Sequence, residues 1–153
     1  MKVLSLFDGI SCGMLALQRA GIPVECYDAF EIDKYAVTVS KRNFPVIVHH
    51  GNVYDGDFTQ FKGYDLLLGG SPCTYWSIAK KDREIDCNGE GFKLFQEYVR
   101  ALEESGCQYF LYENNYSVHQ NIKDEITRVL GVEPIMINSA LVSAQNRKRP
   151  TKQ

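Results

Sequence analysis

The chain has 153 residues, of which 44% are hydrophobic and 24% are charged, and its formal net charge is −2 at pH 7. These values are ordinary for one globular domain of about 100–200 residues, and they exclude a disordered or low-complexity protein. No apolar stretch approaches the ~18 residues of a membrane span, and Asp8 interrupts the apolar start too early for a secretory signal. We therefore expect a cytoplasmic protein without membrane contact.

Five cysteines form an odd number without CxxC spacing, which predicts neither a disulfide framework nor a metal site. The small net charge means that a nucleic-acid partner would have to be held by local basic patches. Two such patches occur, at residues 80–83 and 147–152. Runs of this kind are more often plain solvated surface.

Short apolar runs alternate with segments of helical periodicity, which is typical of βαβ units that build a parallel sheet. The fold class predicted is α/β, a doubly wound and mostly parallel sheet. Asp33 is the predicted cap of the second helix, with Tyr35, Ala36 and Val39 near its apolar face. The predicted strands cover residues 3–7, 26–31, 46–49, 65–68, 109–112 and 133–138, and the predicted helices cover 14–20, 34–43, 92–105 and 117–130.

Residues 71–91 are polar and aperiodic, and they directly follow a predicted strand. A loop of about twenty residues inside a compact domain is uncommon, and its position after a strand end favours a functional segment. The sequence after Asn138 predicts no clear element.

The stretch "LFDGISCG", residues 6–13, runs from a strand through a glycine-bearing turn into a helix. This place suits a nucleotide-like ligand in doubly wound folds, but the spacing of Gly9 and Gly13 is not the GxGxxG of dinucleotide sites. A purely structural turn explains the stretch equally well when it is considered alone. Glu31 follows about twenty residues later, where a carboxylate can accept hydrogen bonds from ribose hydroxyls. Together these features favour an adenosine-containing ligand.

Asn52, in "HGNVYD", follows the third predicted strand and can bond the edge of an adenine. Surface turn chemistry explains a Gly-Asn pair at least as well.

Cys73 lies in "GGSPCTYW", residues 69–76, just past a buried strand and directly after a proline. Composition alone favours a small apolar core residue, whereas the place outside a strand's carboxyl end favours a ligand-binding residue. A nucleophilic role would need nearby positive charge to ionise the thiol, which Lys80, Lys81 or Arg147 could supply.

Two further stretches carry polar groups. In "YFLYENN" a strand delivers Glu113 to the same edge of the sheet as Cys73, where a carboxyl group that donates a hydrogen bond can activate a substrate; a plain surface residue is the alternative. In "QNRKR" the alternate residues Arg147 and Arg149 can face one site or one phosphate.

Five blocks in this order resemble the DNA cytosine-5 methyltransferases over nearly the whole chain: "FDGISCG", "EID", "GGSPC", "ENN" and "QNRKR". The resemblance implies the Rossmann-like methyltransferase fold, S-adenosylmethionine as the methyl donor, and cytosine in DNA as the substrate. It also implies a role in DNA methylation of the restriction-modification kind. Residues 1–68 would be the cofactor-binding half, and residues 69–153 would carry the catalytic loop and the remaining sheet.

For the donor, the resemblance implies that Glu31 holds the ribose and Ile32 packs on the adenine. Asn52 takes a place where the family commonly has Asp at the adenine amino group. An amide keeps the carbonyl acceptor and loses the charge. The remaining donor-binding residues implied are Phe7, Asp8, Gly9, Gly13 and Pro72.

For the chemistry, the resemblance implies that the Cys73 thiolate adds to C6 of a flipped cytosine, so that C5 can attack the methyl group. Glu113 would bond N3, and Arg147 would bond O2 or a nearby phosphate. Asn114 would hold the loop. The substrate-binding residues implied are Ser71, Asn114, Gln145 and Arg149.

Members of the family continue past the Gln-x-Arg-x-Arg block into a target-recognition region, whereas this sequence ends at "RPTKQ". A degraded remnant, one half of a split enzyme completed by a second chain, and a deliberately shortened chain are the competing explanations. We expect little or no methylation by the lone chain, and association through an exposed sheet edge. The alternatives to a methyltransferase are a module that binds S-adenosylmethionine or DNA without turnover, and a nicotinamide oxidoreductase, which the missing GxGxxG disfavours.

Overall fold

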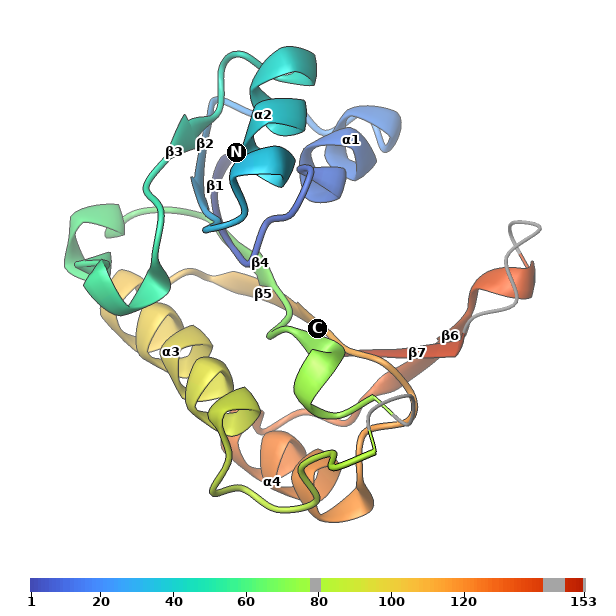
Figure 1. The fold of residues 1–153 in the computed structure, drawn as a ribbon. Coiled ribbons are helices and arrows are strands. Elements are labelled where there is room, and N and C mark those ends of the chain that lie inside the picture. The colour runs from blue at the N-terminus through green and yellow to red at the C-terminus, as the bar shows by residue number, and fades with distance from the viewer. Residues whose placement is uncertain (78–80, 142–147, 153) are drawn as a thin grey trace. The chain divides into compact units, whose positions relative to one another are not determined.

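The computed structural model describes residues 1–77, 81–141 and 148–152 (Figure 1). The chain forms two compact units. Unit 1 is made of Met1–Gly69 with Arg100–Phe110, and unit 2 is made of Gly70–Val99 with Leu111–Gln153. Helix α3 (Glu90–Ser105) and strand β5 (Tyr109–Glu113) each pass from one unit into the other.

Unit 1 contains a parallel sheet in the order β3-β2-β1-β4. Its strands are β1 (Lys2–Leu6), β2 (Cys26–Phe30), β3 (Val48–His49) and β4 (Leu66–Gly69). Residues 3–6 of β1 are all buried, as expected for a strand with both faces covered. The predicted α/β class with a mostly parallel sheet is therefore confirmed.

One face of this sheet is covered by α1 (Cys12–Arg19) and α2 (Lys34–Asn43), which lie beside β1 and β2 in Figure 1. The apolar cluster on this face joins alternate strand residues to the inner side of α1. Its buried members are Val3, Met14, Leu17, Tyr27, Ala29 and Ile47.

The other face is covered by two short 3₁₀ helices, η1 (Val53–Asp55), which buries Val53, and η2 (Phe58–Phe61), which buries two aromatic side chains. The ring of Phe30 in β2 lies 5.2 Å from the ring of Phe58, centre to centre. Arg100 of α3 places its guanidinium 4.5 Å from the Phe58 ring centre and donates to the carbonyls of Val53 and Gly56 at 3.0 and 2.9 Å. These contacts fold the segment between β3 and β4 onto the sheet.

Unit 2 combines part of α3 with α4 (Gln120–Leu130) and with the antiparallel strands β6 (Ile135–Asn138) and β7 (Lys148–Lys152). Strand β7 pairs with both β5 and β6. The buried Tyr112 of β5 lies under α3, with ring centres 5.3 Å from Phe95 and 4.9 Å from Tyr98. Helix α3 therefore packs on the sheet through buried aromatic rings.

Several boundaries differ from the expectations. Helix α4 begins at Gln120 rather than at 117, because the His119 ring nitrogen accepts the backbone N–H of Asn121 as a cap. Strand β7 was not predicted, because its sequence KRPTK is charged and contains Pro150. In the observed register Pro150 pairs with Met136 of β6 and lies beyond the last residue paired with β5.

The predicted apolar face of α2 is wrong, although the predicted bounds of this helix are confirmed. Tyr35 and Val39 are 74% and 41% exposed, whereas Ser40 is fully buried. Asp33 accepts the N–H groups of Tyr35 and Ala36 and is the cap that the sequence predicted.

Within the part of the chain that the structure describes, no helix combines the length and apolarity that crossing a membrane requires. The same residues contain no group of three or more His, Cys, Asp or Glu side chains that could hold a metal ion.

Candidate functional site

The loop after β1 has an unusual backbone in unit 1. Phe7, Gly9 and Ser11 all have positive φ, at 56°, 60° and 64°. The left-handed region disfavours side chains such as those of Phe and Ser, so this conformation needs support from its neighbours. Ser11 precedes α1 and makes no side-chain cap, so the first N–H groups of this helix lack a capping side chain.

Asp8 organises this loop through hydroxyl groups. Its carboxylate accepts from Ser5 at 2.6 Å, from Tyr27 at 2.7 Å, and from Ser11. Burial, with a further contribution from the negative charge of Asp8, raises the pKa of Tyr27, so this phenol stays protonated and donates. The carboxylate predicted to face a ligand therefore has three internal partners.

Glu31 connects the end of β2 to the same loop. Its carboxylate accepts the N–H of Gly9 at 2.8 Å and the N–H groups of Ile32 and Asp33, also at 2.8 Å. Ile32 is 75% exposed, which leaves an apolar side chain available beside this carboxylate. The predicted ribose-binding and adenine-packing residues thus lie next to the Gly9 turn.

The two glycines of the loop have different roles. Gly9 has open space where a Cβ would be, together with the positive φ that favours glycine. At Gly13 a Cβ would lie only 2.8 Å from Leu68 Cδ1 and from Tyr27 Oη. Gly13 is therefore required for close packing of α1 against the sheet, a reason that its motif alone did not indicate.

Asn52 is exposed at the start of η1. Its side-chain oxygen accepts the N–H of Tyr54 at 3.1 Å and caps this short helix. The turn chemistry considered for this residue is present, and its proposed bond to adenine stays a prediction.

In unit 2 the chain after β4 lies directly on the end of β5. A Cβ built on Gly70 would be 2.0 Å from the backbone oxygen of Glu113, closer than real Cβ atoms approach. Only glycine allows this contact. It brings the segment that contains Cys73 beside the residue predicted to be its acidic partner.

A buried hydrogen-bond network fixes the same segment. The Ser71 hydroxyl lies 2.6 Å from the Tyr112 hydroxyl, and the Asn114 amide donates to the Ser71 carbonyl at 3.2 Å and to the Tyr112 oxygen at 3.3 Å. All three residues are buried. Burial raises the pKa of Tyr112 to about 12. The Ser71 side chain, predicted to bind substrate, thus has its partner inside the protein.

Cys73 begins the short 3₁₀ helix η3 (Cys73–Tyr75), with Pro72 at its N-cap, and the cysteine is partly exposed. Just after it, the fully buried Trp76 donates from its indole nitrogen to Glu84 at 3.1 Å. Glu84 also accepts the N–H of Gly91, where a Cβ would lie 2.6 Å from the indole nitrogen. The described parts of the long loop are therefore ordered around Trp76.

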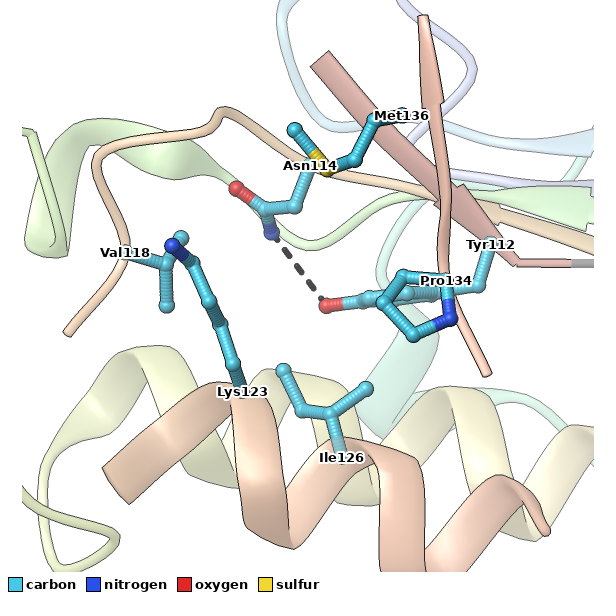
Figure 2. Close-up of a pocket in the computed structure, with 7 residues that line it drawn as sticks. All are labelled: Tyr112, Asn114, Val118, Lys123, Ile126, Pro134 and Met136. Carbon is cyan, nitrogen blue, oxygen red and sulfur yellow. Dashed lines mark hydrogen bonds between the residues drawn. The ribbon is translucent and has the colours of Figure 1, made fainter. Parts of the chain in front are cut away.

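A small apolar cavity of about 50 Å³ lies in unit 2. Figure 2 shows the bonded pair of Asn114 and Tyr112 on its wall, facing α4. Burial lowers the pKa of Lys123, whose ammonium lies 4.5 Å from the Tyr116 ring centre. The lining residues are Tyr112, Asn114, Val118, Lys123, Ile126, Pro134 and Met136.

Some predicted residues lie outside the described residues, namely Lys80, Gln145 and Arg147. Arg149 belongs to β7, for which the structure gives the backbone. Hydroxyl-bearing and imidazole residues surround Asp8, and of these only Ser11 lies in a motif that the sequence indicated; the others are Ser5, Tyr27, Ser40 and His49. Ser5 and Tyr27 sit inside predicted strands, where nothing in the sequence distinguishes them from core positions.

The chain is similar to known proteins in sequence and in fold. The sequence profile of the C-5 cytosine-specific DNA methylases matches residues 1–133. The orphan methyltransferase M.SPRI of Bacillus phage SPR is 32% identical over 97% of this chain, and M.Rho11sI of Bacillus phage rho11s is 36% identical over 74%. The chain spans 36% and 23% of the lengths of these two relatives.

The fold is also shared with a solved structure, the Dnmt2 methyltransferase of S. pombe. The TM-score is 0.75 at 18% sequence identity, over 99% of this chain and 50% of that one. This likeness supports the Rossmann-like methyltransferase fold. On the match to the family profile and to the phage relatives, the chain belongs to the C-5 cytosine-specific DNA methylase family.

Proposed function

We propose that this chain carries the donor-binding and catalytic residues for transfer of a methyl group from S-adenosylmethionine to C5 of cytosine in DNA. The proposal rests on the family and on one observation within unit 2. Gly70 and Asn114 hold the Ser71–Cys73 segment against the end of β5, where Glu113 lies. A partly exposed thiol and a carboxyl group are thereby carried by neighbouring backbone segments.

The residues of unit 1 fit the proposed donor. Glu31 offers carboxylate oxygens for ribose hydroxyls, and Ile32 offers an exposed apolar surface for an adenine. The N-terminus of α1, without a side-chain cap, and the open space at Gly9 suit the polar amino-acid end of the molecule. When bound, S-adenosylmethionine would supply an electrophilic methyl group on a sulfonium.

The proposed chemistry assigns a task to Cys73 and to Glu113 of unit 2. The Cys73 thiolate would form a bond to C6 of a flipped cytosine, and the electrons of the C5–C6 double bond would move to C5, which would take the methyl group as the sulfur–methyl bond of the donor breaks and leaves a neutral thioether. Glu113 stabilises the ring by a hydrogen bond at N3. Loss of the proton from C5 then restores the double bond and expels the thiolate.

Trapping on DNA that contains 5-fluorocytosine tests this proposal. Fluorine replaces the C5 hydrogen that must be lost as a proton before the thiolate is expelled, so the covalent adduct persists. DNA substituted at every cytosine makes knowledge of the target sequence unnecessary. We expect an adduct that survives denaturing electrophoresis, requires S-adenosylmethionine, and disappears in Cys73→Ala. Cys87→Ala, which removes a partly exposed thiol to which the proposal gives no role, is the matched control.

An adduct that persists in Cys73→Ala would refute the assignment of the nucleophile. Binding of S-adenosylmethionine without any adduct would favour the binding module over the enzyme. The chain spans 36% and 23% of the lengths of the two phage relatives, and a trapped adduct cannot turn over, so transfer of labelled methyl groups to unmodified DNA is the separate measurement of whether this chain completes the reaction.

A further inference from the structure

A chain of hydrogen bonds runs through unit 1 from β3 to the loop after β1. The imidazole Nε2 of His49 lies 3.1 Å from the Ser40 hydroxyl, which lies 2.5 Å from the Ser11 hydroxyl. Ser11 in turn donates to the carboxylate of Asp8. Ser40 and Ser11 are both fully buried, so these groups have no water to replace a missing partner.

The carboxylate of Asp8, the last acceptor in this series of hydrogen bonds, determines the direction of every other bond in it. An ionised carboxylate only accepts, so the one hydroxyl proton of Ser11 points to Asp8. Ser40 must then donate its own proton to Ser11. The proton between Ser40 and His49 therefore belongs to His49, whose Nε2 must carry a hydrogen.

The other nitrogen of the His49 ring supports the same assignment. Nδ1 is buried and has no hydrogen-bond partner among the described residues. A proton there would be a buried donor without an acceptor, which costs more than a buried lone pair. Burial, and after it the positive charge of Lys41, lowers the pKa of His49, against the opposing negative charges of Asp8 and Glu31.

The register of the strands explains why this series of hydrogen bonds can form. His49, Ala29 and Ser5 are register partners across β3, β2 and β1, so their side chains share one face of the sheet. The small Ala29 leaves space between the two polar neighbours. Ser40, the buried residue of α2, lies over this space and reaches Ser11 at the start of α1.

We infer that His49 and Ser40 are positioning residues: the chain His49–Ser40–Ser11 orients Asp8 and holds Ser11 in its left-handed conformation, which sets the shape of the Gly9–Gly13 turn. The role as a support for donor binding rests on the proposed function of that turn. In this role His49 acts only through the two serines and needs no contact with the donor.

The test compares variants that keep or remove the terminal donor. His49→Gln retains an N–H group at a similar reach, and His49→Leu removes it at similar size. Ser40→Ala removes the hydroxyl group that connects His49 to Ser11 by hydrogen bonds. Thr38→Ala is the matched control, because Thr38 is exposed on the same helix and its hydroxyl donates to the Lys34 carbonyl at 2.7 Å, within its own helix.

Calorimetry with S-adenosylmethionine gives the first readout. We expect about tenfold weaker binding in His49→Leu and Ser40→Ala, from one lost buried hydrogen bond, and nearly unchanged binding in His49→Gln and Thr38→Ala. Equal affinity of His49→Leu, His49→Gln and the unmodified chain would overturn the inference while leaving the proposed function intact.

Nitrogen-15 spectra at pH 7.5 give a second readout that needs no ligand. The His49 ring should be neutral with its proton on Nε2, and the amide signals of Gly9 and Cys12 should move in His49→Leu but not in His49→Gln. A proton on Nδ1, or unmoved amide signals, would refute the inference. If the unmodified chain binds no S-adenosylmethionine, the proposed function fails, and these spectra still decide whether His49 shapes the turn.

Discussion

Replacing Gly70 by alanine tests the contact that brings the Cys73 segment to β5. The new Cβ would start 2.0 Å from the Glu113 carbonyl oxygen, and Cβ atoms essentially never lie within 3.0 Å of another heavy atom, so the backbones must separate by at least 3.0 − 2.0 = 1.0 Å. A carbonyl cannot rotate away as a side chain does. Overpacking of this kind costs about 3 kcal/mol, at the upper end of the usual range.

For a protein of this size, about 3 kcal/mol lowers the melting temperature by roughly 6–12 °C. Differential scanning fluorimetry measures this change. Thr74→Ala, at an exposed position of the same segment, is the control and should change the unfolding free energy by less than about 0.5 kcal/mol. We also expect adduct formation on 5-fluorocytosine DNA to slow by about a hundredfold, because a displacement of about 1 Å misplaces the thiol.

The result that refutes this reasoning is a Gly70→Ala protein that melts within a degree of the unmodified chain. It would mean that the segment does not lie against Glu113. A lower melting temperature with an unchanged trapping rate would confirm the contact and separate it from the chemistry.

Three further predictions concern single side chains. Gly13→Ala should cost about 1–3 kcal/mol in thermal unfolding, because its methyl group would begin 2.8 Å from Tyr27 Oη; a neutral outcome would contradict the close packing of α1. Between pH 10 and 12 Tyr112 alone should account for a loss of up to about 3 kcal/mol of unfolding free energy, because the folded state keeps its proton up to about pH 12 and the unfolded state releases it near pH 10. Tyr27, whose pKa burial also raises, adds a loss of its own, so urea titrations of Tyr112→Phe should show a smaller alkaline loss than the unmodified chain, and an identical pH profile in both proteins would disprove the assignment. Val118→Ile should raise the urea midpoint by the equivalent of up to about 0.8 kcal/mol, since one methylene fits the cavity of about 50 Å³; a lowered midpoint would show that the added group clashes.

The sequence predicted those elements whose signals are local. Helix α2 has its predicted bounds because Asp33 caps it through contacts two and three residues away. Strands β1 and β4 were recognisable because they are short and mainly apolar runs, as is usual in a parallel sheet that is covered on both faces. Neither feature depends on residues far away in the sequence.

The errors occurred where distant polar groups decide burial. Hydropathy favoured Tyr35 and Val39 on the inner face of α2, whereas Ser40 is buried because Ser11 and His49 satisfy its hydroxyl. Strand β7 was not predicted, since pairing with β5 and β6, and not its own composition, makes KRPTK a strand. Such pairings have no signature within a short window of sequence.

The candidate site shows the same difference between local signals and contacts of residues distant in the sequence. The order of motifs identified Cys73, Glu113 and Glu31 as candidates from residue type and position alone. It did not reveal that Gly70 is required by the Glu113 carbonyl, because that contact joins segments more than forty residues apart. The catalytic and binding roles of these residues stay predictions until the trapping and calorimetric experiments are done.

The buried Trp76 has a practical consequence. It is the one tryptophan in the sequence, three positions after Cys73, and its indole bonds Glu84 inside the segment that follows the cysteine. Fluorescence excited at the red edge of the protein spectrum therefore comes from this place, without any label. A shift of its emission on adding DNA would report on the surroundings of the cysteine, and Glu84→Gln would show how far that signal depends on the indole bond.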